Sequence, residues 1–159
     1  MGVEIERKYL LRNQSWRGLA AGVAYCQGYI PTPDHRTVRV RTAGETGYLT
    51  LKGPVQGMSR SEFEYEIPVA EAEQILATLC DRPLIEKIRY KIPCAGHVWE
   101  LDEFLGENLG LILIEVELGS EAETLVLPDW VGLEVTGDRR YYNSYLAKHP
   151  FRQWPDSVT

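Results

Sequence analysis

Charged and apolar side chains alternate along much of the chain. In the first such stretch, Val3–Leu11, the charged residues Glu4, Glu6 and Lys8 occupy every second position, and the apolar Ile5 lies between the first two. Residues two apart on a β-strand point to the same face, roughly 6.7 Å from one another along the strand. The same period of two returns in later stretches: 37–41, 48–52, 60–67, 87–92, 99–102 and 114–118. The pattern predicts β-strands that are charged on one face and apolar on the other.

Turn-forming residues separate these stretches and bound the predicted strands. We expect strands at 3–11, 25–30, 36–42, 47–52, 60–67, 84–92, 97–104, 111–118 and 130–136. A hairpin-like succession of about eight strands with a few helices predicts a mainly β (α+β) fold, either an antiparallel barrel or a sandwich. In a sandwich the charged faces would lie in solvent, whereas in a closed barrel they would line a polar lumen. The period alone leaves these two arrangements open.

Three segments are expected to be helical. Residues 68–80 change to a helical period, with acidic residues in the first turn. The sequence Ser120-Glu-Ala-Glu resembles a capping box and predicts a short helix that Pro128 ends. A last helix is expected over 138–148, with Asp138 as its cap. Residues 1–150 are expected to form a single domain, and 151–159 a frayed tail.

Composition narrows the class of protein. The chain has 159 residues, of which 44% are hydrophobic and 25% charged, as is usual for one globular domain. The net charge of −6 argues against a general nucleic-acid binder. No apolar run approaches about 18 residues, and no signal peptide is visible, so we expect no membrane association. Three cysteines without a C-x-x-C spacing indicate reduced thiols and a cytoplasmic protein.

The order of the charged motifs resembles that of a known family. Glu4-Ile-Glu-Arg-Lys8 matches the ExExK opening of the CYTH superfamily, the triphosphate tunnel metalloenzymes. The match continues in order with Arg39 and Arg41, Thr50-Leu-Lys52, Arg60/Glu62/Glu64, Glu86-Lys87-Ile-Arg89-Tyr90, Glu100-Leu-Asp102, Glu115-Val-Glu117 and Glu134-Val-Thr-Gly-Asp-Arg-Arg-Tyr-Tyr-Asn143. The resemblance covers nearly the whole chain and is greatest to small bacterial members that act on inorganic tripolyphosphate. It implies an eight-stranded antiparallel closed tunnel barrel with a few flanking helices.

The resemblance also implies divalent-metal-dependent hydrolysis of tripolyphosphate to pyrophosphate and phosphate. The substrate would be bound by basic residues, because a linear triphosphate carries several negative charges and arginine binds phosphate oxygens in a bidentate manner. The expected substrate-binding residues are Lys8, Arg39, Arg41, Lys52, Arg60, Lys87, Arg89 and, at the tunnel mouth, Arg139.

The carboxylates are expected to bind metal, since hard oxygen ligands suit Mg²⁺ or Mn²⁺. The expected metal ligands are Glu4, Glu6, Glu115, Glu117 and Asp102, and the alternative for Asp102 is to orient Arg89 or Lys52. The expected catalytic residues are Glu62 and Glu64, which would position the nucleophile, and Lys8 and Lys87, which would neutralise the transferred phosphoryl group. Tyr29 is included with them, with a core position as its alternative.

The sequence leaves other functions open. Within the family, adenylate cyclase and thiamine or nucleoside triphosphatase activity would use the same phosphate-binding wall. A module that binds polyphosphate without turnover belongs to a different class. A small anionic triphosphate is the expected partner, and a homodimer could bury the outward apolar faces. No P-loop and no Rossmann glycine motif is present.

Overall fold

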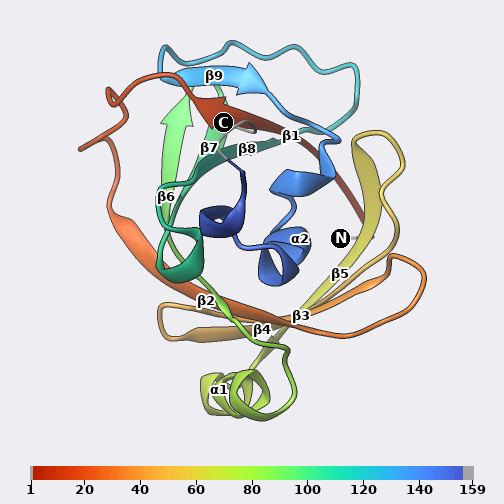
Figure 1. Cartoon of the computed structure of the whole chain (residues 1–159). Helices are drawn as coiled ribbons and strands as arrows, with labels where there is room; N and C mark the ends of the chain where they lie inside the picture. The colour runs from red at the N-terminus through yellow and green to blue at the C-terminus, as the bar shows by residue number, and fades with distance from the viewer. Residues whose placement is uncertain (1, 156–159) are drawn as a thin grey trace.

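The computed structural model describes residues 2–155, which form a closed antiparallel barrel (Figure 1). Hydrogen-bonded neighbours follow the order β5-β4-β3-β2-β6-β7-β8-β1, and β1 also pairs with β5, so that eight strands close the barrel. The strands are β1 (Val3–Leu11), β2 (Gly22–Ile30), β3 (Thr37–Ala43), β4 (Thr46–Lys52), β5 (Ser59–Ile67), β6 (Ile85–Cys94), β7 (His97–Phe104), β8 (Ile112–Glu117) and β9 (Val131–Glu134). The predicted eight-stranded tunnel barrel is confirmed, and the sandwich is excluded.

The first strand closes the barrel by pairing on both of its edges. One edge pairs with β8 from Glu6 to Leu10. The other edge is divided, because Val3–Ile5 pairs with β5 whereas Tyr9 and Leu11 pair with the extra strand β9. Closure of the sheet through β1 places the charged faces of the strands toward the lumen, and β2, which has no charged residue, contributes Tyr29 to it.

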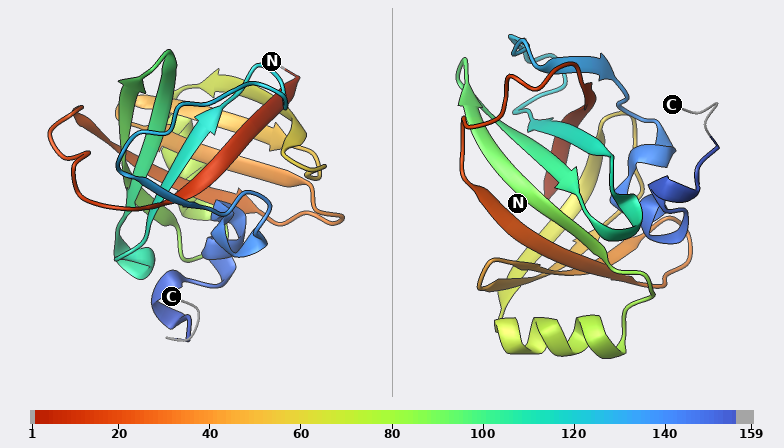
Figure 2. Two further views of the ribbon diagram at one scale, coloured as in Figure 1. Left: turned by 90° about the horizontal axis from the view of Figure 1, so that it is seen from above. Right: turned by 60° about the vertical axis from the view of Figure 1, so that its left-hand side comes forward.

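The apolar faces of the barrel strands point outward and are covered in two places. Tyr9, Trp99 and the loop residues Trp16 and Trp130 pack together outside β1 and β7, each less than 5% exposed. Helix α1 (Val69–Thr78) lies against the outer face of β3 and β4, well away from the lumen (Figure 2). The predicted helix 68–80 is therefore confirmed, with ends one or two residues inside the expected ones.

The C-terminal segment closes one end of the barrel. It consists of the 3₁₀ turn η2 (Arg139–Tyr141), helix α2 (Asn143–Lys148) and the 3₁₀ turn η3 (Phe151–Gln153), which lie together at that end (Figures 1 and 2). At this end the inward-facing side chains are apolar, and they form a buried cluster with the segment: Ile85, Phe104, Leu113, Tyr141, Leu146 and Ala147. The barrel is thus closed by an apolar layer at one end and holds its charges above that layer.

Two predicted helices differ from the structure. Residues 120–128 form a turn and a segment without regular secondary structure. The Glu123 carboxylate accepts a hydrogen bond from Gly119 N (2.6 Å), and Leu125 packs against the outer aromatic cluster. The expected helix 138–148 is divided into η2 and α2 by the extended Tyr142 (φ −75°, ψ 137°). Asp138 does cap η2, since its carboxylate accepts from Arg140 N at 3.1 Å.

The tail also differs in part from the prediction. Phe151 N donates to the Asn108 side chain at 2.8 Å, and the Phe151 and Trp154 rings lie 5.1 Å apart. Residues 151–154 are therefore packed rather than frayed, whereas 156–159 lie outside the described residues. A further short turn, η1 (Gly106–Asn108), leads into β8. Among the described residues, no helix has the length and apolarity required to cross a membrane.

The contact between α1 and the barrel depends on Gly47 in β4. A Cβ atom on Gly47 would lie 2.8 Å from Ala72 Cβ and 3.0 Å from the Ile67 carbonyl oxygen. Because the carbonyl belongs to the backbone, a Gly47→Val variant should unfold with a free energy about 1–3 kcal/mol lower in urea titrations. Gly53→Ala is the control, since its Cβ would meet Ser61 Cβ only at 3.4 Å. Equal stabilities would contradict this account of the α1 contact.

Candidate functional site

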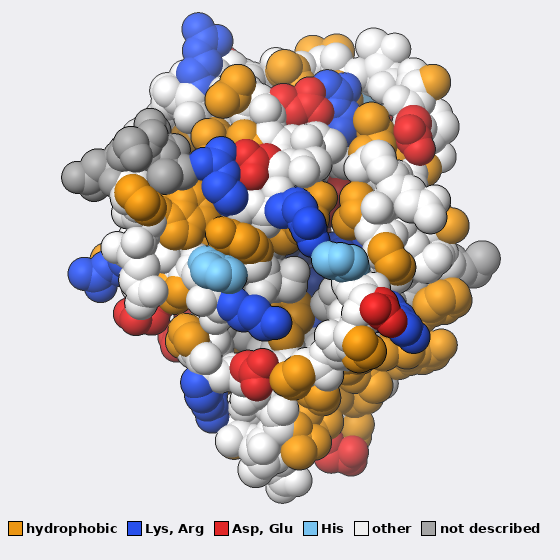
Figure 3. Space-filling model, turned by 45° about the vertical axis from the view of Figure 1, so that its right-hand side comes forward, with side chains coloured by type: hydrophobic (Ala, Val, Ile, Leu, Met, Phe, Trp, Pro, Cys, Tyr) orange, Lys and Arg blue, Asp and Glu red, His pale blue; other side chains and the backbone are white. Residues whose placement is uncertain are grey.

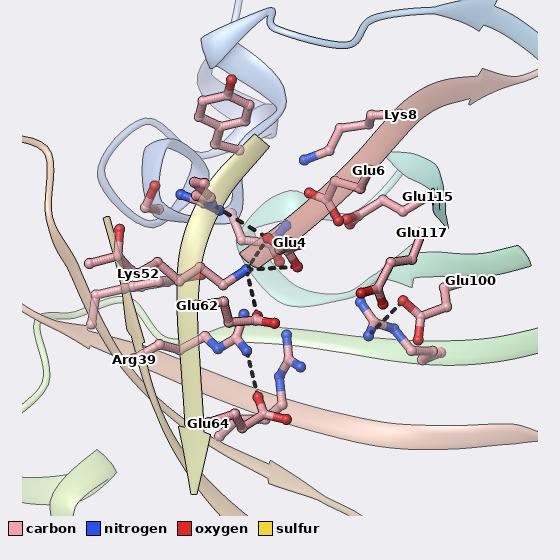
Figure 4. Close-up of a pocket in the computed structure, with 18 of the residues that line it drawn as sticks. Glu4, Glu6, Lys8, Arg39, Lys52, Glu62, Glu64, Glu100, Glu115 and Glu117 are labelled. Carbon is pink, nitrogen blue, oxygen red and sulfur yellow. Dashed lines mark hydrogen bonds and ion pairs between the residues drawn. The ribbon is translucent and has the colours of Figure 1, made fainter. Parts of the chain in front are cut away.

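The lumen contains a polar cavity of about 160 Å³ (Figure 4). Its lining consists almost entirely of charged and polar side chains from the eight barrel strands and the C-terminal segment: Glu4, Glu6, Lys8, Tyr29, Thr37, Arg39, Arg41, Lys52, Arg60, Glu62, Glu64, Lys87, Arg89, Glu100, Glu115, Glu117, Tyr142, Asn143 and Ser144. The strand register therefore brings together all of the predicted site residues except Asp102 and Arg139.

One wall of the cavity is a network of ion pairs between β1, β3, β4 and β5. The Arg39 guanidinium lies 3.2 Å from a Glu64 oxygen, and Thr50 donates to the same carboxylate at 2.7 Å. Lys52 Nζ lies 3.1 Å from Glu4 and 3.3 Å from Glu62. These carboxylates hold the cations in place around the lumen, and an anion that entered would compete with them for the same N–H donors.

The deeper wall is built on a buried triad of charges. Asp102 is 1% exposed and accepts from Arg89 at 2.7 and 2.8 Å, while Lys87 Nζ lies 2.8 Å from it. Burial lowers the pKa of Lys87 to about 7, although Asp102 opposes the shift. Burial would raise the pKa of Asp102, but Arg89 and Lys87 outweigh it and lower that pKa.

Both oxygens of Asp102 are thus occupied by cations behind the cavity wall. The structure favours the orienting role over the predicted metal-ligand role, and the oriented cations are Arg89 and Lys87 rather than Lys52. Arg139 is the other exception among the predicted site residues. It lines a wider cavity of about 830 Å³ at the tunnel mouth, where its guanidinium lies 3.0 Å from His35 Nδ1.

The wall formed by β1 and β8 carries several carboxylates close together. Glu6 and Glu115 point toward one another (Figure 4), and burial together with Glu115 raises the pKa of Glu6 well above its usual value. Burial and the neighbouring Glu4, Glu62 and Glu100 raise the pKa of Glu117. Among residues 2–155, no three acidic, histidine or cysteine side chains already lie close enough to enclose a metal ion. The donor set nevertheless suits a hard cation, because positive charge between these carboxylates would relieve their repulsion.

Arg41 differs from the other lumen arginines. Within the described part of the chain it forms no ion pair, and its Nε donates instead to the amide oxygen of Gln27 at 2.9 Å. Burial, Arg39 and Arg89 lower the pKa of Arg41 to about 9. Arg39 and Arg89 have carboxylate partners, so among residues 2–155 the cation without one in this group of three is Arg41.

Several lining residues had no role in the sequence-based prediction. Tyr142 places its ring 5.1 Å from Lys8 Nζ, and Asn143 Oδ1 accepts from Lys87 Nζ at 2.8 Å. Both belong to the last motif of the family resemblance, but nothing in the local pattern places them inside the barrel. Glu100 lines the cavity and belongs to one of the motifs, but it had no assigned role. Gln27 is buried behind the lining, and no signal in the sequence marked it because it lies outside the charged motifs.

Comparisons with known proteins agree over almost the full length. A CYTH domain family model matches residues 2–142. An inorganic triphosphatase of Acetivibrio thermocellus is 51% identical over 156 residues, which cover 98% of this chain and 100% of the relative. An inorganic triphosphatase of Nitrosomonas europaea is 42% identical over 149 residues, which cover 91% and 96%.

Solved structures show the same fold. The crystal structure of the inorganic triphosphatase NE1496 matches with a TM-score of 0.65 and 37% identity, over 90% of this chain and 96% of that chain. The PH1012 protein from Pyrococcus horikoshii matches with a TM-score of 0.56 and 18% identity, over 74% and 79%. At the latter identity the likeness concerns the fold alone.

The buried triad should be essential for stability. Replacing Asp102 by Asn removes the carboxylate that pairs with both Lys87 and Arg89 and leaves Arg89 only its longer ion pair with Glu100 (3.4 Å), which should lower the free energy of unfolding by about 3–5 kcal/mol. For a chain of this size the melting temperature should fall by roughly 6–20 °C, which calorimetry measures. Glu103→Gln on the same strand is the matched control, because Glu103 pairs with Arg17 at the surface (3.4 Å) and should have little effect. Equal melting temperatures for the two variants would refute the triad's role.

Proposed function

The chain belongs to the CYTH domain family, and we propose that it is an inorganic triphosphatase, a hydrolase that cleaves tripolyphosphate to pyrophosphate and phosphate. The observation that carries this proposal is the convergence of basic side chains from five strands on one enclosed cavity: Lys8, Arg39, Arg41, Lys52, Arg60, Lys87 and Arg89. Such a convergence of cations on one cavity suits a compact polyanion. The names of the two relatives, both inorganic triphosphatases, support the same substrate.

The cations would both position the substrate and stabilise the transition state. Catalysis of phosphoryl transfer rests mainly on positioning and on electrostatic stabilisation of the equatorial oxygens. The guanidinium groups of Arg39, Arg41 and Arg89 are buried and held from behind, so that little reorganisation accompanies the reaction. Lys8 and Lys87 would neutralise charge that develops on the transferred group and on the leaving oxygen.

The carboxylates would hold Mg²⁺ or Mn²⁺, which both suit oxygen ligands. Glu4, Glu6, Glu115 and Glu117 are the residues proposed to bind the metal. The raised pKa of Glu6, caused by burial and by Glu115, supports the assignment, because a cation beside it would favour the charged carboxylate. When bound, the ion supplies charge neutralisation of the phosphate oxygens. Glu62 and Glu64 are proposed to position the attacking water, and Tyr29, which lines the cavity, is proposed to contact the substrate.

Activity assays test the proposal directly. Phosphate release should be fast with tripolyphosphate, slow with ATP and thiamine triphosphate, and abolished by chelator, because the cavity binds phosphate groups and offers the carboxylates to a divalent ion. Glu6→Gln should reduce turnover on the order of 100-fold, since it removes a ligand charge at nearly constant volume.

A matched control for Glu6→Gln is Glu66→Gln, because Glu66 is an exposed carboxylate on β5 outside the cavity lining. Thermal melting of both variants separates lost function from lost folding. Turnover that persists in excess chelator would contradict the metal assignment. Turnover of ATP that exceeds that of tripolyphosphate would contradict the substrate.

Part of the outer face, where the start of β1, the end of β4 and β5 lie together, is not covered by α1 or by the aromatic cluster. Leu51 and Phe63 lie opposite one another in the β4–β5 register, and they are 40% and 48% exposed. Tyr65 and Val3 extend the patch, and hydrophobic side chains gather at the lower right of Figure 3. We propose that a second copy of the chain covers this patch, because a two-fold contact buries one apolar surface against itself.

We also propose a cytoplasmic location. The three cysteines Cys26, Cys80 and Cys94 all lie among the described residues and form no disulfide, and free thiols are typical of that compartment.

Analytical ultracentrifugation, which measures the mass of the particle in solution, tests the proposed dimer. The wild-type protein should sediment at twice the 18.1 kDa chain mass, whereas Phe63→Glu should shift it to the monomer because it places a charge within the apolar contact. Leu133→Glu serves as the control, since Leu133 is 71% exposed on β9 outside the patch. A wild-type protein that stays monomeric at all concentrations would overturn the proposed dimer.

A further inference from the structure

One uncharged side chain is buried directly behind the cationic lining of the cavity. Gln27 on β2 is 0% exposed, and its amide oxygen accepts a hydrogen bond from Arg41 Nε at 2.9 Å. Its amide nitrogen donates to the Tyr29 hydroxyl oxygen at 2.8 Å and to Asn143 Oδ1 at 3.2 Å. Gln27 does not itself line the cavity, but each of these three partners does.

The chemistry of the partners determines the orientation of the amide. An arginine N–H can only donate, so the atom that faces Arg41 must be the carbonyl oxygen of Gln27. The Gln27 NH₂ group consequently faces Tyr29 and Asn143, and this orientation uses the hydrogen-bonding capacity of a buried amide on both of its ends. A flipped amide would place two donors against each other at Arg41.

This orientation leaves donors available for a ligand. The Tyr29 oxygen accepts from Gln27, so its own hydrogen is free to point into the cavity. Asn143 Oδ1 accepts from both Gln27 and Lys87 (2.8 Å), which directs the Asn143 NH₂ group elsewhere. The remaining N–H groups of Arg41 add to these donors. Gln27 thus holds side chains from β2, β3 and the C-terminal segment in one donor set.

Gln27 also preserves the charge of Arg41. Arg39 is paired with Glu64 and Arg89 with Asp102, so the carboxylates offset much of their charge. Arg41 has a neutral amide in the equivalent place, and hence its whole positive charge remains for an anion in the cavity. An acidic residue at position 27 would satisfy the same N–H group but would cancel that charge.

We propose that Gln27 is a positioning residue that sets the affinity for the triphosphate, by aiming Arg41, Tyr29 and Asn143 at one phosphate group and by leaving the Arg41 charge uncompensated. This inference rests on the proposed triphosphatase function and deepens it. Gln27 acts through its three partners and does not touch the substrate. Its removal should therefore change binding more than turnover at saturation.

Gln27→Glu is the variant that tests this role. The carboxylate introduced by this substitution would pair with Arg41 and could not donate to Tyr29 or Asn143. Hydrogen bonds to charged groups contribute enough that the Kd for tripolyphosphate should rise about 10- to 100-fold. Calorimetry in chelator measures the Kd without turnover, and steady-state kinetics with metal should show the same rise in KM with a smaller change in kcat.

Two further variants separate charge from shape. Gln27→Met keeps the volume of the side chain and leaves Arg41 unpaired, so it should weaken binding less than Gln27→Glu does. Gln74→Glu adds the same charge on the exposed face of α1 and should leave the Kd unchanged. The expected result is a Kd that is highest for Gln27→Glu, intermediate for Gln27→Met and lowest for the wild-type protein.

The outcomes distinguish this inference from the proposed function. A wild-type protein that binds and hydrolyses tripolyphosphate, together with an unchanged Kd and KM in Gln27→Glu, would overturn the role of Gln27 alone. A lower melting temperature and lower kcat at unchanged KM would assign Gln27 a purely structural role and would overturn it as well. Failure of the wild-type protein to bind tripolyphosphate would overturn both proposals.

Discussion

Closure of the sheet by β1 is the constraint on which the arrangement of this molecule depends. Seven of the eight barrel strands carry charged side chains that alternate with apolar ones, and β2 has no charged residue. A strand has two faces, so this alternation collects the charges on one of them. Once β1 pairs with both β8 and β5, the charged faces of neighbouring strands meet across one small lumen. The apolar faces then point outward, where α1 and the aromatic loop cluster cover most of them. An open sheet with the same pairing would expose one of the two faces to the wrong environment.

The charges in the lumen are matched unevenly. Asp102 offsets Arg89 and Lys87 at the deep wall, and Glu64 and Glu4 offset Arg39 and Lys52 at the β1–β5 wall. Two groups are matched less well, because burial and Glu115 raise the pKa of Glu6 well above its usual value and because Arg41 faces an amide. A divalent cation beside Glu6 and a polyanion beside Arg41 would satisfy both groups, which is the arrangement expected for a triphosphate bound together with a metal ion.

The C-terminal segment connects the stability of the barrel with the geometry of the site. Its apolar residues Leu146 and Ala147 complete the layer that closes one end of the lumen. Its first polar residues, Tyr142 and Asn143, contact Lys8 and Lys87 on strands that lie far away in the sequence. The extended conformation of Tyr142 ends η2 and starts α2. The residues that contact the site lysines and the residues that close the barrel therefore lie within a few positions of one another.

The sequence by itself determined the strands and the alternation that places their charged residues on one face. Through the ordered motifs it also determined the family to which the chain belongs. Those features are local, because a strand and its two faces follow from neighbouring residues. The period alone did not decide which face lies inside, and only the family resemblance favoured the tunnel. Tertiary structure decided the partner of Asp102, the position of Gln27 among Arg41, Tyr29 and Asn143, and the loss of the helix expected at 120–128. Each of these depends on contacts between segments distant in the chain, and no local pattern encodes which distant group will neutralise a charge or accept a hydrogen bond.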